Sequence, residues 1–456
     1  MRKKIIASFC VGLMTVSLAP LSAFAHDIHE VNDKIKALEA QLEQLKALVA
    51  QEVNKRTEDS AALESKVSEV AKVADEANSK ESNNNLTLVE GTTLSYGGYI
   101  RVNGTFDDYE DGATPTAEVA SRILVPSVIP IEGSSVSEGN EFNSDVATSR
   151  FFFKTATETS AGIVKSHVEL DFLAGGGDER ISNSNNSRIR HAYLAWDYAP
   201  DASILVGQTW STFFNVGALP DEIDFIGPTS GSLFNRQQQI RWTKKLKGGG
   251  SIMLAAENPS TSLDDAGSGI SDNDIDDNSI PDLVARYNGK LGSHSYALSV
   301  IGREIAYNDG VLDESDSGFG VNFSGKFNIA NGDEIKYSIS HGTLGRYIAL
   351  NAFRDGGIDA DGNLDLTDVT GGYLSYRRNW SDKWRSIFTY AFSSADLANG
   401  ISTATTEEVS NFNASLIYAP TPRLTFGGGI ISAERELENG LSGDLTRLQF
   451  MSRYVF

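Results

Sequence analysis

The sequence has a single cysteine among its 456 residues, and that residue, Cys10, lies in a segment that we expect to be removed. The segment has basic residues at positions 2–4, then an apolar stretch, then Ala23-Phe24-Ala25. This pattern predicts a secretory signal peptide over residues 1–25, and Pro20 argues against a membrane anchor. An exported chain without a disulfide must take its stability from an extensive hydrogen-bonded framework.

Long hydrophobic runs and an excess of positive charge are also missing. After the signal peptide no stretch of 18 apolar residues occurs, so we expect no transmembrane helix. The 61 acidic residues outnumber the 39 basic ones, which argues against general nucleic-acid binding and favours a solvated surface. Such a chain can still cross a membrane as a β-barrel, because a closed sheet satisfies every backbone group internally.

The usual sequence motifs of hydrolases and metalloenzymes are absent as well. The chain contains no H-E-x-x-H and no G-x-S-x-G motif, and only five histidines follow His26. We therefore expect no enzymatic activity and no required cofactor.

Residues 26–85 are predicted to form a self-associating helix and a short linker. Apolar residues recur there at spacings of three and four, and no Pro or Gly interrupts them. The seam comprises Ile28, Val31, Ile35, Leu38, Leu42, Leu45 and Val49. A narrow seam with charged flanks predicts a coiled coil, and its mixture of Leu and β-branched residues leaves dimer and trimer open. A single amphipathic helix lying on another surface is the alternative.

From residue 92 onward the hydrophobic period changes to two, the period of β-strands. Sixteen candidate strands are joined by seven short connections and eight long ones. The short ones are 159–162, 200–201, 247–250, 291–293, 330–333, 381–383 and 420–422, and the long ones are 107–146, 173–187, 212–234, 259–280, 307–316, 344–367, 395–406 and 435–443. This alternation predicts a 16-stranded antiparallel transmembrane β-barrel over residues 92–456.

A soluble β-sandwich or propeller would show a similar alternation of apolar and polar residues. Phe319, Val321 and Phe323, for example, alternate with Asn322 and Ser324, and this alone does not tell which face meets water. Aromatic residues at strand ends favour the membrane barrel, because Trp and Tyr gather at membrane–water interfaces. These residues are Trp196, Tyr198, Trp242, Trp380, Trp384, Tyr418 and Tyr454.

Six stretches of the barrel segment carry a family resemblance. They are "YGGYIRVNG", "SRFFFKT", "RIRHAYLAW", "GQTWSTFF", "RQQQIRW" and the terminal "RYVF". With the N-terminal coiled coil, they make the chain resemble Gram-negative general porins, and more closely the DcaP-like trimeric porins, over essentially the whole mature length. The resemblance implies an outer-membrane homotrimer with a periplasmic coiled coil, a third loop folded into the pore, and a Phe456 read by the barrel-assembly machinery. It also implies passive diffusion of small hydrophilic solutes, with anions such as dicarboxylates preferred.

Alternation within the strands places several basic residues on the face expected to line the lumen. They are Arg101, Arg150, Lys154, Arg241 and, with its face undecided, Arg190. Arg190 shares one strand face with Leu194 and Trp196, which look lipid-directed, and a bulge would reconcile the three. General porins carry a basic ladder on the matching strands, so the resemblance implies a site for carboxylate or phosphate here. The alternative is that each arginine pairs with a neighbouring acid and fills the wall.

The third long loop carries three acids, Asp221, Glu222 and Asp224. The resemblance implies that they face the basic ladder across a constriction. Alternatively they lie at the mouth of the pore and repel anions, so these residues leave the sign of ion selectivity open. The total negative charge decides little, because much of it lies in the outer loops.

The outer loops are dense in Asp, Asn and Gly. "DGGIDADGNLDLTD" contains Asp359, Asp361 and Asp365, which are oxygen ligands at a spacing suited to calcium. The stretch departs from the EF-hand pattern, because its glycine is misplaced and no Glu occupies the twelfth position. The alternative is a flexible acidic loop that divalent ions bridge to lipopolysaccharide.

A structural tether competes with the channel as a function. In that case the coiled coil would space the outer membrane from peptidoglycan, and transport would be secondary. Loss of envelope integrity on deleting residues 26–85, with conductance unchanged, would favour the tether.

Overall fold

The computed structural model describes residues 85–89, 91–115, 118–133, 139–173, 177–178, 182, 184–264 and 278–456. The predicted signal peptide and all of the predicted coiled coil and linker except Asn85 lie outside these residues. In the described part of the chain, no helix is long and apolar enough to span a membrane.

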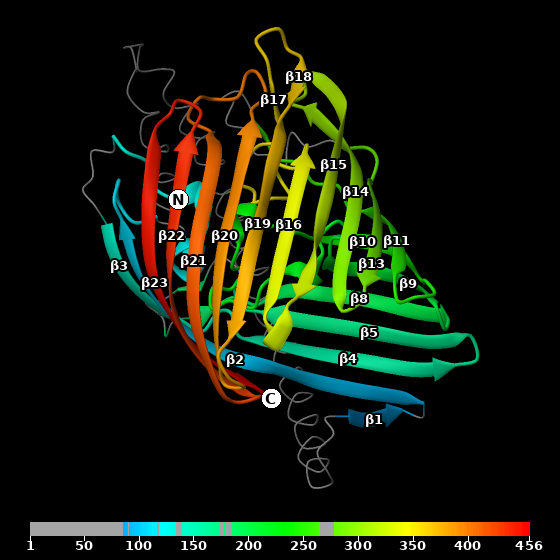
Figure 1. Cartoon of the computed structure of the whole chain (residues 1–456). Coiled ribbons are helices and arrows are strands. Elements are labelled where there is room, and N and C mark those ends of the chain that lie inside the picture. The colour runs from blue at the N-terminus through cyan, green and yellow to red at the C-terminus, as the bar shows by residue number, and fades with distance from the viewer. Residues whose placement is uncertain are drawn as a thin grey trace, which may run out of the picture. The chain divides into compact units, whose positions relative to one another are not determined.

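Sixteen antiparallel strands form one closed barrel (Figure 1). We call each of the sixteen strand positions around the barrel a stave. Their strands are β2 (Thr92–Tyr109), β4 (Arg150–Thr159), β5 (Gly162–Asp171), β8 (Arg188–Ala199), β9 (Ala202–Trp210), β10 (Arg236–Lys245), β11 (Ser251–Glu257), β13 (Asp282–Leu291), β14 (His294–Asn308), β15 (Asp313–Asn328), β16 (Glu334–Gly342), β19 (Asp368–Asn379), β20 (Trp384–Asp396), β21 (Thr406–Thr421), β22 (Leu424–Leu437) and β23 (Ser442–Val455). β2 pairs with β4 on one side and with β23 on the other, which closes the sheet. The predicted all-β, 16-stranded antiparallel fold is therefore confirmed.

Several shorter elements accompany the staves. β1 (Asn85–Val89) pairs with the start of β2, and β3 (Gly139–Asp145) continues the stave of β4 along the rest of β2. The connections contain α2 (Glu118–Arg122), η1 (Pro126–Val128), η2 (Val216–Ala218), η3 (Thr229–Gly231), η4 (Ala330–Gly332), β6 (Gly177–Asp178), β7 (Ser184–Asn185), β12 (Leu263–Asp264), β17 (Gly356–Ile358) and β18 (Leu364–Leu366). β12, β17 and β18 form a small separate sheet, and β6 pairs with β7.

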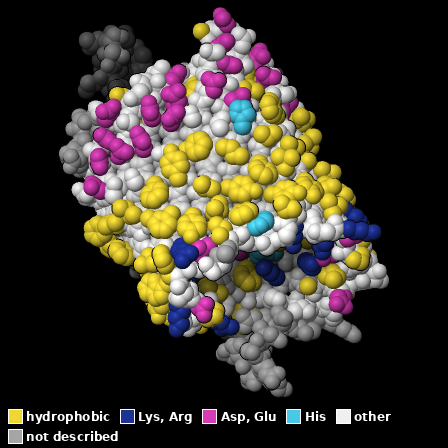
Figure 2. Space-filling model, viewed as in Figure 1, with side chains coloured by type: hydrophobic (Ala, Val, Ile, Leu, Met, Phe, Trp, Pro, Cys, Tyr) yellow, Lys and Arg dark blue, Asp and Glu magenta, His cyan; other side chains and the backbone are white. Residues whose placement is uncertain are grey.

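The outer face of the barrel is apolar and the inner face is polar. On β15, Phe319, Val321 and Phe323 are exposed, whereas Asn322 and Ser324 are buried. Figure 2 shows hydrophobic side chains as a band across the face in view, with acidic side chains on the loop side of the band and Lys and Arg on the other side. A sandwich would bury its apolar face, so this polarity is that of a membrane barrel.

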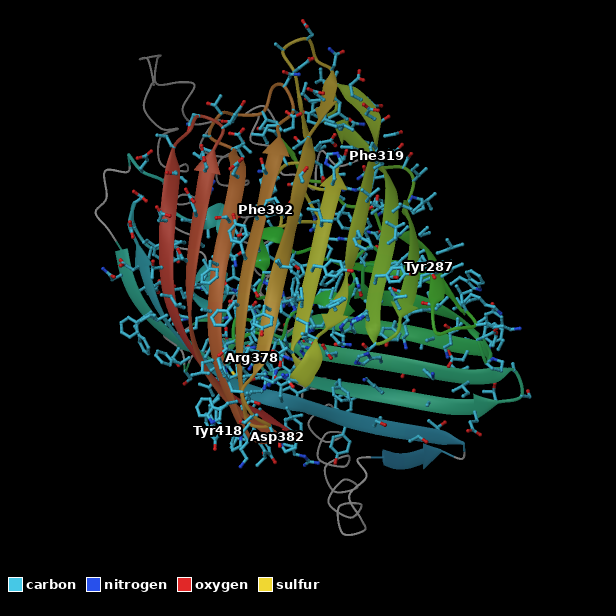
Figure 3. The ribbon with its side chains drawn as sticks, in the orientation of Figure 1. Tyr287, Phe319, Arg378, Asp382, Phe392 and Tyr418 are labelled. Atoms are coloured by element: carbon cyan, nitrogen blue, oxygen red, sulfur yellow. The ribbon has the colours of Figure 1, made fainter. Side chains whose placement is uncertain are left out.

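Aromatic residues mark the end of the barrel that carries the short turns. Trp196, Tyr198, Trp380 and Tyr454 are exposed there. Trp384 stacks on Tyr418, with 4.6 Å between the ring centroids. Tyr418, Arg378 and Asp382 lie together at this end in Figure 3, away from Phe319 and Phe392. These aromatics form the belt expected at one membrane–water interface.

The last strand lies where its alternation predicts. Leu448, Phe450 and Tyr454 of β23 are exposed on the outer face, whereas Arg447 and Gln449 are buried inside. Arg447 donates from Nε and Nη2 to the two carboxylate oxygens of Asp107 in β2, at 2.6 Å each, and both side chains are fully buried. Nη2 also donates to the carbonyl of Ala120, at 2.6 Å. This ion pair links β2 and β23, the two strands whose pairing closes the barrel.

We expect Arg447→Met or Asp107→Leu alone to lower the free energy of unfolding by about 3–5 kcal/mol, because each leaves a buried charge unpaired. The shift is measured as a lower urea midpoint for the folded, fast-migrating form on gels. The double variant Arg447→Met/Asp107→Leu should regain most of the loss. Wild-type midpoints in both single variants would contradict a fastening role for the pair.

Candidate functional site

The connection between β9 and β10, residues 211–235, crosses the inside of the barrel, and we call it the third loop. Its backbone carbonyls accept hydrogen bonds from side chains on distant staves. Arg286 of β13 donates to the carbonyl of Phe214 at 2.8 Å, and Lys336 of β16 donates to that of Leu219 at 2.7 Å. Ser393 of β20 donates to that of Ser230 at 2.5 Å. The third loop therefore lies in the lumen.

Apolar residues of the third loop explain why it stays inside. Ile223 packs with Ile387, Ile417 and Met451 of the opposite wall. Gly427 and Gly429 of β22 leave room for it, because a Cβ at either position would collide with the Ile223 side chain. Arg101 of β2 donates from Nη2 to the carbonyl of Ile223, which pins the same segment to the first stave.

A basic cluster lines the wall made by β4, β5 and β8. Arg190 donates to Glu169 at 2.8 Å and to Asp171 at 2.7 Å, and Arg188 also binds Asp171, at 2.8 Å. Arg150 lies 3.3 Å from Glu169. Three guanidinium groups thus share two carboxylates, which leaves the cluster positive. Arg190 is only 1% exposed, whereas the Arg150 and Arg188 side chains are 23% and 32% exposed.

A bulge places Arg190 in this cluster. Glu169 pairs with His191 and Leu170 pairs with Ile189, so Arg190 is an extra residue in the register between β5 and β8. Arg190 and His191 are both buried inside as a result, while Leu194 and Trp196 remain on the outer face. A bulge, which would reconcile the positions of Arg190, Leu194 and Trp196, is therefore present.

Aromatic rings link the arginines along this wall. The Arg150 guanidinium lies 5.2 Å from the ring centroid of Tyr99 and 5.8 Å from that of Phe225 in the third loop. Arg190 lies 5.4 Å from the Phe225 ring. Arg236 lies 4.5 Å from the ring of Trp210. These contacts hold the guanidinium groups side by side with few compensating acids.

Arg101, Lys154 and Arg241 take different places. Arg101 is buried and donates to Asn103 at 2.7 Å as well as to the third loop, so it acts as an anchor. Lys154 is exposed, with Nζ 4.6 Å from the Phe152 ring centroid. Arg241 is half-buried on β10. Of these five ladder residues, Arg150 and Arg190 are the two that the structure brings into one cluster with Arg188.

Arg236 and Phe225 were not found from the sequence. Strict alternation with Gln237 and Gln239, which are buried inside, would place Arg236 on the lipid face. Arg236 is the first residue of β10, next to the third loop, and its place over Trp210 brings it inward instead. No pattern in the loop sequence distinguishes Phe225 from its other apolar residues.

The three acids of the third loop bond to β20, β21 and β23. Asp221, whose side chain is 47% exposed, binds Arg385 at 2.7 Å and lies 3.8 Å from Arg453. Glu222 is buried and accepts hydrogen bonds from Thr389 and, at 2.7 Å, from Asn413.

Asp224 completes the set and is also buried. It accepts from the backbone N–H groups of Ile226 and Gly227, at 3.0 and 2.8 Å, and from Gln449 at 3.1 Å. Glu222 and Asp224 thus hold the third loop in shape, and Asp221 is the member of the trio that reaches water.

The three aspartates of the outer loop do not converge. Asp359 accepts from the backbone N–H groups of Asp361 and Asn363, at 2.9 and 2.8 Å, whereas Asp365 accepts from Asn399 at 2.6 Å. The described residues include no group of three or more His, Cys, Asp or Glu side chains that could hold a metal ion. The arrangement of Asp359, Asp361 and Asp365 thus gives no support for the predicted calcium site.

Comparisons with known proteins place the chain among outer-membrane proteins. The model of the family described as DcaP outer membrane protein matches residues 14–456. No curated protein matches the sequence. The solved outer membrane channel DcaP of Acinetobacter baumannii superposes with a TM-score of 0.68 at 20% identity, over 82% of this chain and 100% of that chain.

Two further solved structures share the fold at lower similarity. OmpF of Salmonella typhi in complex with daunomycin has a TM-score of 0.52 at 10% identity, over 81% of this chain and 100% of its own. OmpT of Vibrio cholerae has a TM-score of 0.50 at 10% identity, over 82% of this chain and 100% of its own.

Glu222 should make the third loop sensitive to pH. Burial raises the pKa of this carboxyl from 4.5 to about 7, despite the opposing bonds from Thr389 and Asn413. The folded state therefore keeps the proton to higher pH than the unfolded state, and the stability this gives is lost as pH rises from about 4.5 to about 7. The loss is at most about 3 kcal/mol.

Hydrogen exchange in residues 211–235, corrected for intrinsic rates, should therefore be faster at pH 8 than at pH 5. Glu222→Gln should remove most of this difference, and Asp221→Asn, which alters an exposed acid of the same loop, should leave it intact. An unchanged pH dependence in Glu222→Gln would contradict the assignment.

Proposed function

The chain belongs to the family of DcaP outer membrane proteins, and from this we propose that it passes small hydrophilic solutes by passive diffusion, anions in preference to cations. The barrel is an outer-membrane, porin-like channel similar to DcaP and other porins. The anion preference is our inference from the charges in the lumen.

One observation carries that preference, namely the surplus of cations on the wall formed by β4, β5, β8 and β10. Arg150, Arg188 and Arg190 share only two carboxylates. In the part of the chain that the structure describes, Lys154, Arg236 and Arg241 have no acidic partner within 4.0 Å.

The acids of the third loop do not compensate this surplus, because they bond to residues of β20, β21 and β23. Guanidinium groups crowded on a low-dielectric wall attract carboxylate and phosphate groups and leave a cation without a stabilising partner. A solute anion would therefore be the species that this wall favours.

We also propose that the channel assembles as a homotrimer, with the predicted coiled coil in the periplasm. The proposal is supported by the heptad seam of residues 26–85 and by the resemblance of the barrel sequence to trimeric porins. Contacts with lipopolysaccharide, the barrel-assembly machinery and peptidoglycan remain predictions from the sequence, as does the tether.

Chemical cross-linking of the full chain in native outer membranes should give a ladder that ends at three times the monomer mass. Deleting residues 26–84, which removes the whole predicted heptad seam, should weaken this ladder. A ladder ending at one or two copies would contradict the trimer.

Removing arginines from the wall should shift ion selectivity toward cations. We expect Arg150→Ala and Arg236→Ala each to lower the anion-to-cation permeability ratio about fivefold, which corresponds to about 1 kcal/mol per charge. The measurement is the reversal potential of the purified protein in planar bilayers under a salt gradient.

Arg423→Ala, which removes an exposed arginine from a short turn, is the matched control and should leave the ratio unchanged. Wild-type ratios in both wall variants would refute the anion preference but not the channel. A wild-type protein without conductance would refute the channel itself.

A further inference from the structure

A second connection also enters the barrel, between β16 and β19. Its first part, residues 343–355, has the sequence "TLGRYIALNAFRD", and we call it the clamp loop. Leu344, Tyr347, Ile348 and Phe353 are at most 1% exposed. The sequence placed these residues in a long outer loop, so their burial inside the barrel is a difference from that expectation. The apolar composition of the stretch, unusual among acidic outer loops, was the available signal.

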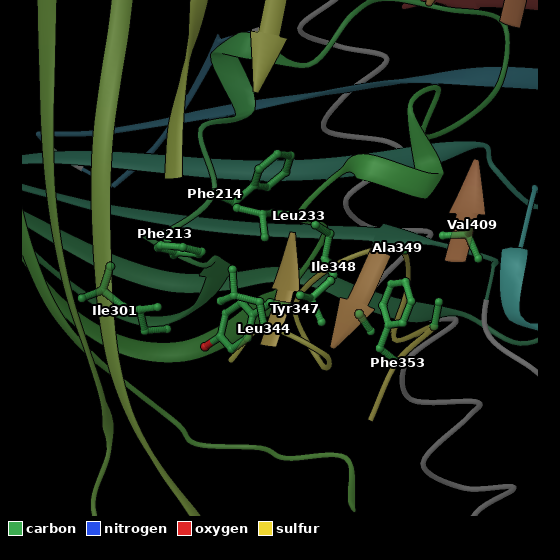
Figure 4. Packing of buried hydrophobic residues seen from close by; sticks show 14 of the residues in the cluster. Phe213, Phe214, Leu233, Ile301, Leu344, Tyr347, Ile348, Ala349, Phe353 and Val409 are labelled. Carbon is green, nitrogen blue, oxygen red and sulfur yellow. The ribbon is translucent and has the colours of Figure 1, made fainter. Parts of the chain in front are cut away.

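The clamp loop and the third loop share one apolar core. Figure 4 shows Phe213, Phe214 and Leu233 of the third loop gathered with Tyr347 and Ile348. Residues of the surrounding staves complete this core: Ala255, Val284, Ile301, Val369, Ala395 and Val409. Two loops and six staves are thus packed together, which occupies part of the lumen with a solid core.

Backbone hydrogen bonds join the two loops directly. The N–H of Ala349 donates to the carbonyl of Ser232 at 3.1 Å, and that of Phe234 donates to the carbonyl of Tyr347 at 3.3 Å. Leu233 and Ile348 are partners in an antiparallel bridge. The returning leg of the third loop therefore pairs with the clamp loop, as one strand pairs with another.

One arginine fixes the clamp loop to the wall. Arg303 of β14 binds Asp355 with two hydrogen bonds, of 2.7 and 3.2 Å, and donates to the carbonyl of Thr343 at 2.9 Å. It thereby holds both ends of the clamp loop. Tyr347 donates to Asp282 of β13 at 2.7 Å, and the Arg303 guanidinium lies 4.9 Å from its ring centroid. The Arg303 and Asp355 side chains are fully buried.

The tip of the clamp loop reaches the part of the third loop that faces the basic wall. Ala349, Leu350 and Asn351 have φ values of 51°, 57° and 63°, a left-handed run that non-glycine residues adopt only when their surroundings impose it. Leu350 packs against the cluster that contains Ile226 and is partly lined by Phe225. Phe225 is the ring against which Arg101, Arg150 and Arg190 lie.

We infer that residues 343–355 position the constriction: held by Arg303, the clamp loop fixes the third loop against the basic wall and so sets the width of the passage. The inference rests on the proposed channel function. In this view Arg303, Asp355 and Tyr347 determine the pore width by holding the clamp loop in place, and none of them needs to touch a solute.

Arg303→Met tests the inference, because it removes the bonds that hold both ends of the clamp loop. We expect single-channel conductance to rise about twofold and larger uncharged polyethylene glycols to enter the pore, since a loosely supported loop loses its position. Arg447→Met is the matched control, as it breaks another fully buried arginine–aspartate pair that has no described bond to the clamp loop. It should leave the size limit unchanged.

A disulfide between the loops should reverse the effect. The predicted mature chain has no cysteine, so Leu233→Cys/Ile348→Cys can be introduced into Arg303→Met without competing thiols. Oxidation should restore wild-type conductance and size limit, and reduction should remove the restoration. A folded Arg303→Met with wild-type properties would overturn the inference, and so would a widened pore that the disulfide fails to narrow.

Two further measurements cover the remaining outcomes. Tyr347→Phe removes the bond to Asp282 and the 3.2 Å bond that Tyr347 accepts from Gln237, but it leaves Arg303 in place. It should shift the size limit in the same direction by a smaller amount. If Arg303→Met does not fold, a wild-type size limit in Tyr347→Phe overturns the inference. If the wild-type protein does not conduct, the proposed function fails, and hydrogen exchange decides the positioning role separately. Residues 211–235 should then exchange faster in Tyr347→Phe than in wild type, and equal rates would overturn it.

Discussion

The inversion of polarity in the closed sheet is the constraint on which the rest of the structure depends. Lipid accepts the apolar side chains outside, so the charged side chains at membrane depth are directed into the barrel. A ring of sixteen staves encloses more space than their own side chains can fill. The third loop and the clamp loop occupy part of that space, and they bring apolar residues such as Phe213 and Ile348 into an interior that the staves alone would leave polar.

The arginines of the lumen divide into two groups by what surrounds them. Arg303 and Arg447 are fully buried, and each binds an aspartate with paired hydrogen bonds; Arg303 also lies 3.6 Å from Asp282. Their charges therefore fix the geometry of the clamp loop and of the β2–β23 junction. Such pairs stabilise little compared with apolar packing, but their geometry is specific. Arg150 and Arg188 keep part of their surface in water and share their acids, so their field extends into the lumen. Arg190 has features of both groups. It is buried like Arg303 and Arg447, but it shares its carboxylates with Arg150 and Arg188 and so adds to the positive charge of the wall.

The sequence was informative wherever a period of two decides the outcome. Alternation located the strands, the short turns and the outward faces, because lipid enforces the pattern residue by residue. It left the face of Arg190 undecided, and the bulge in β8 decides it. It could not locate the partners of Glu222 and Asp224, which depend on how far a loop travels across the barrel. The positions of Arg236 and of the clamp loop could not be predicted for the same reason. The first residue of a strand and a loop follow no hydrophobic period, so their places depend on long-range packing.

The bulge in β8 makes the number of lumen-facing residues independent of the register of the lipid-facing residues. In a regular strand, one inserted residue moves every later side chain to the opposite face. Here Arg190 is the extra residue, and Leu194 and Trp196 beyond it still face outward. The wall can therefore accept a change in the number of lumen-facing residues at this point while its lipid-facing surface keeps its register. Removing the extra residue would return this strand to regular pairing, with one lumen-facing side chain fewer and with Leu194 and Trp196 still toward lipid.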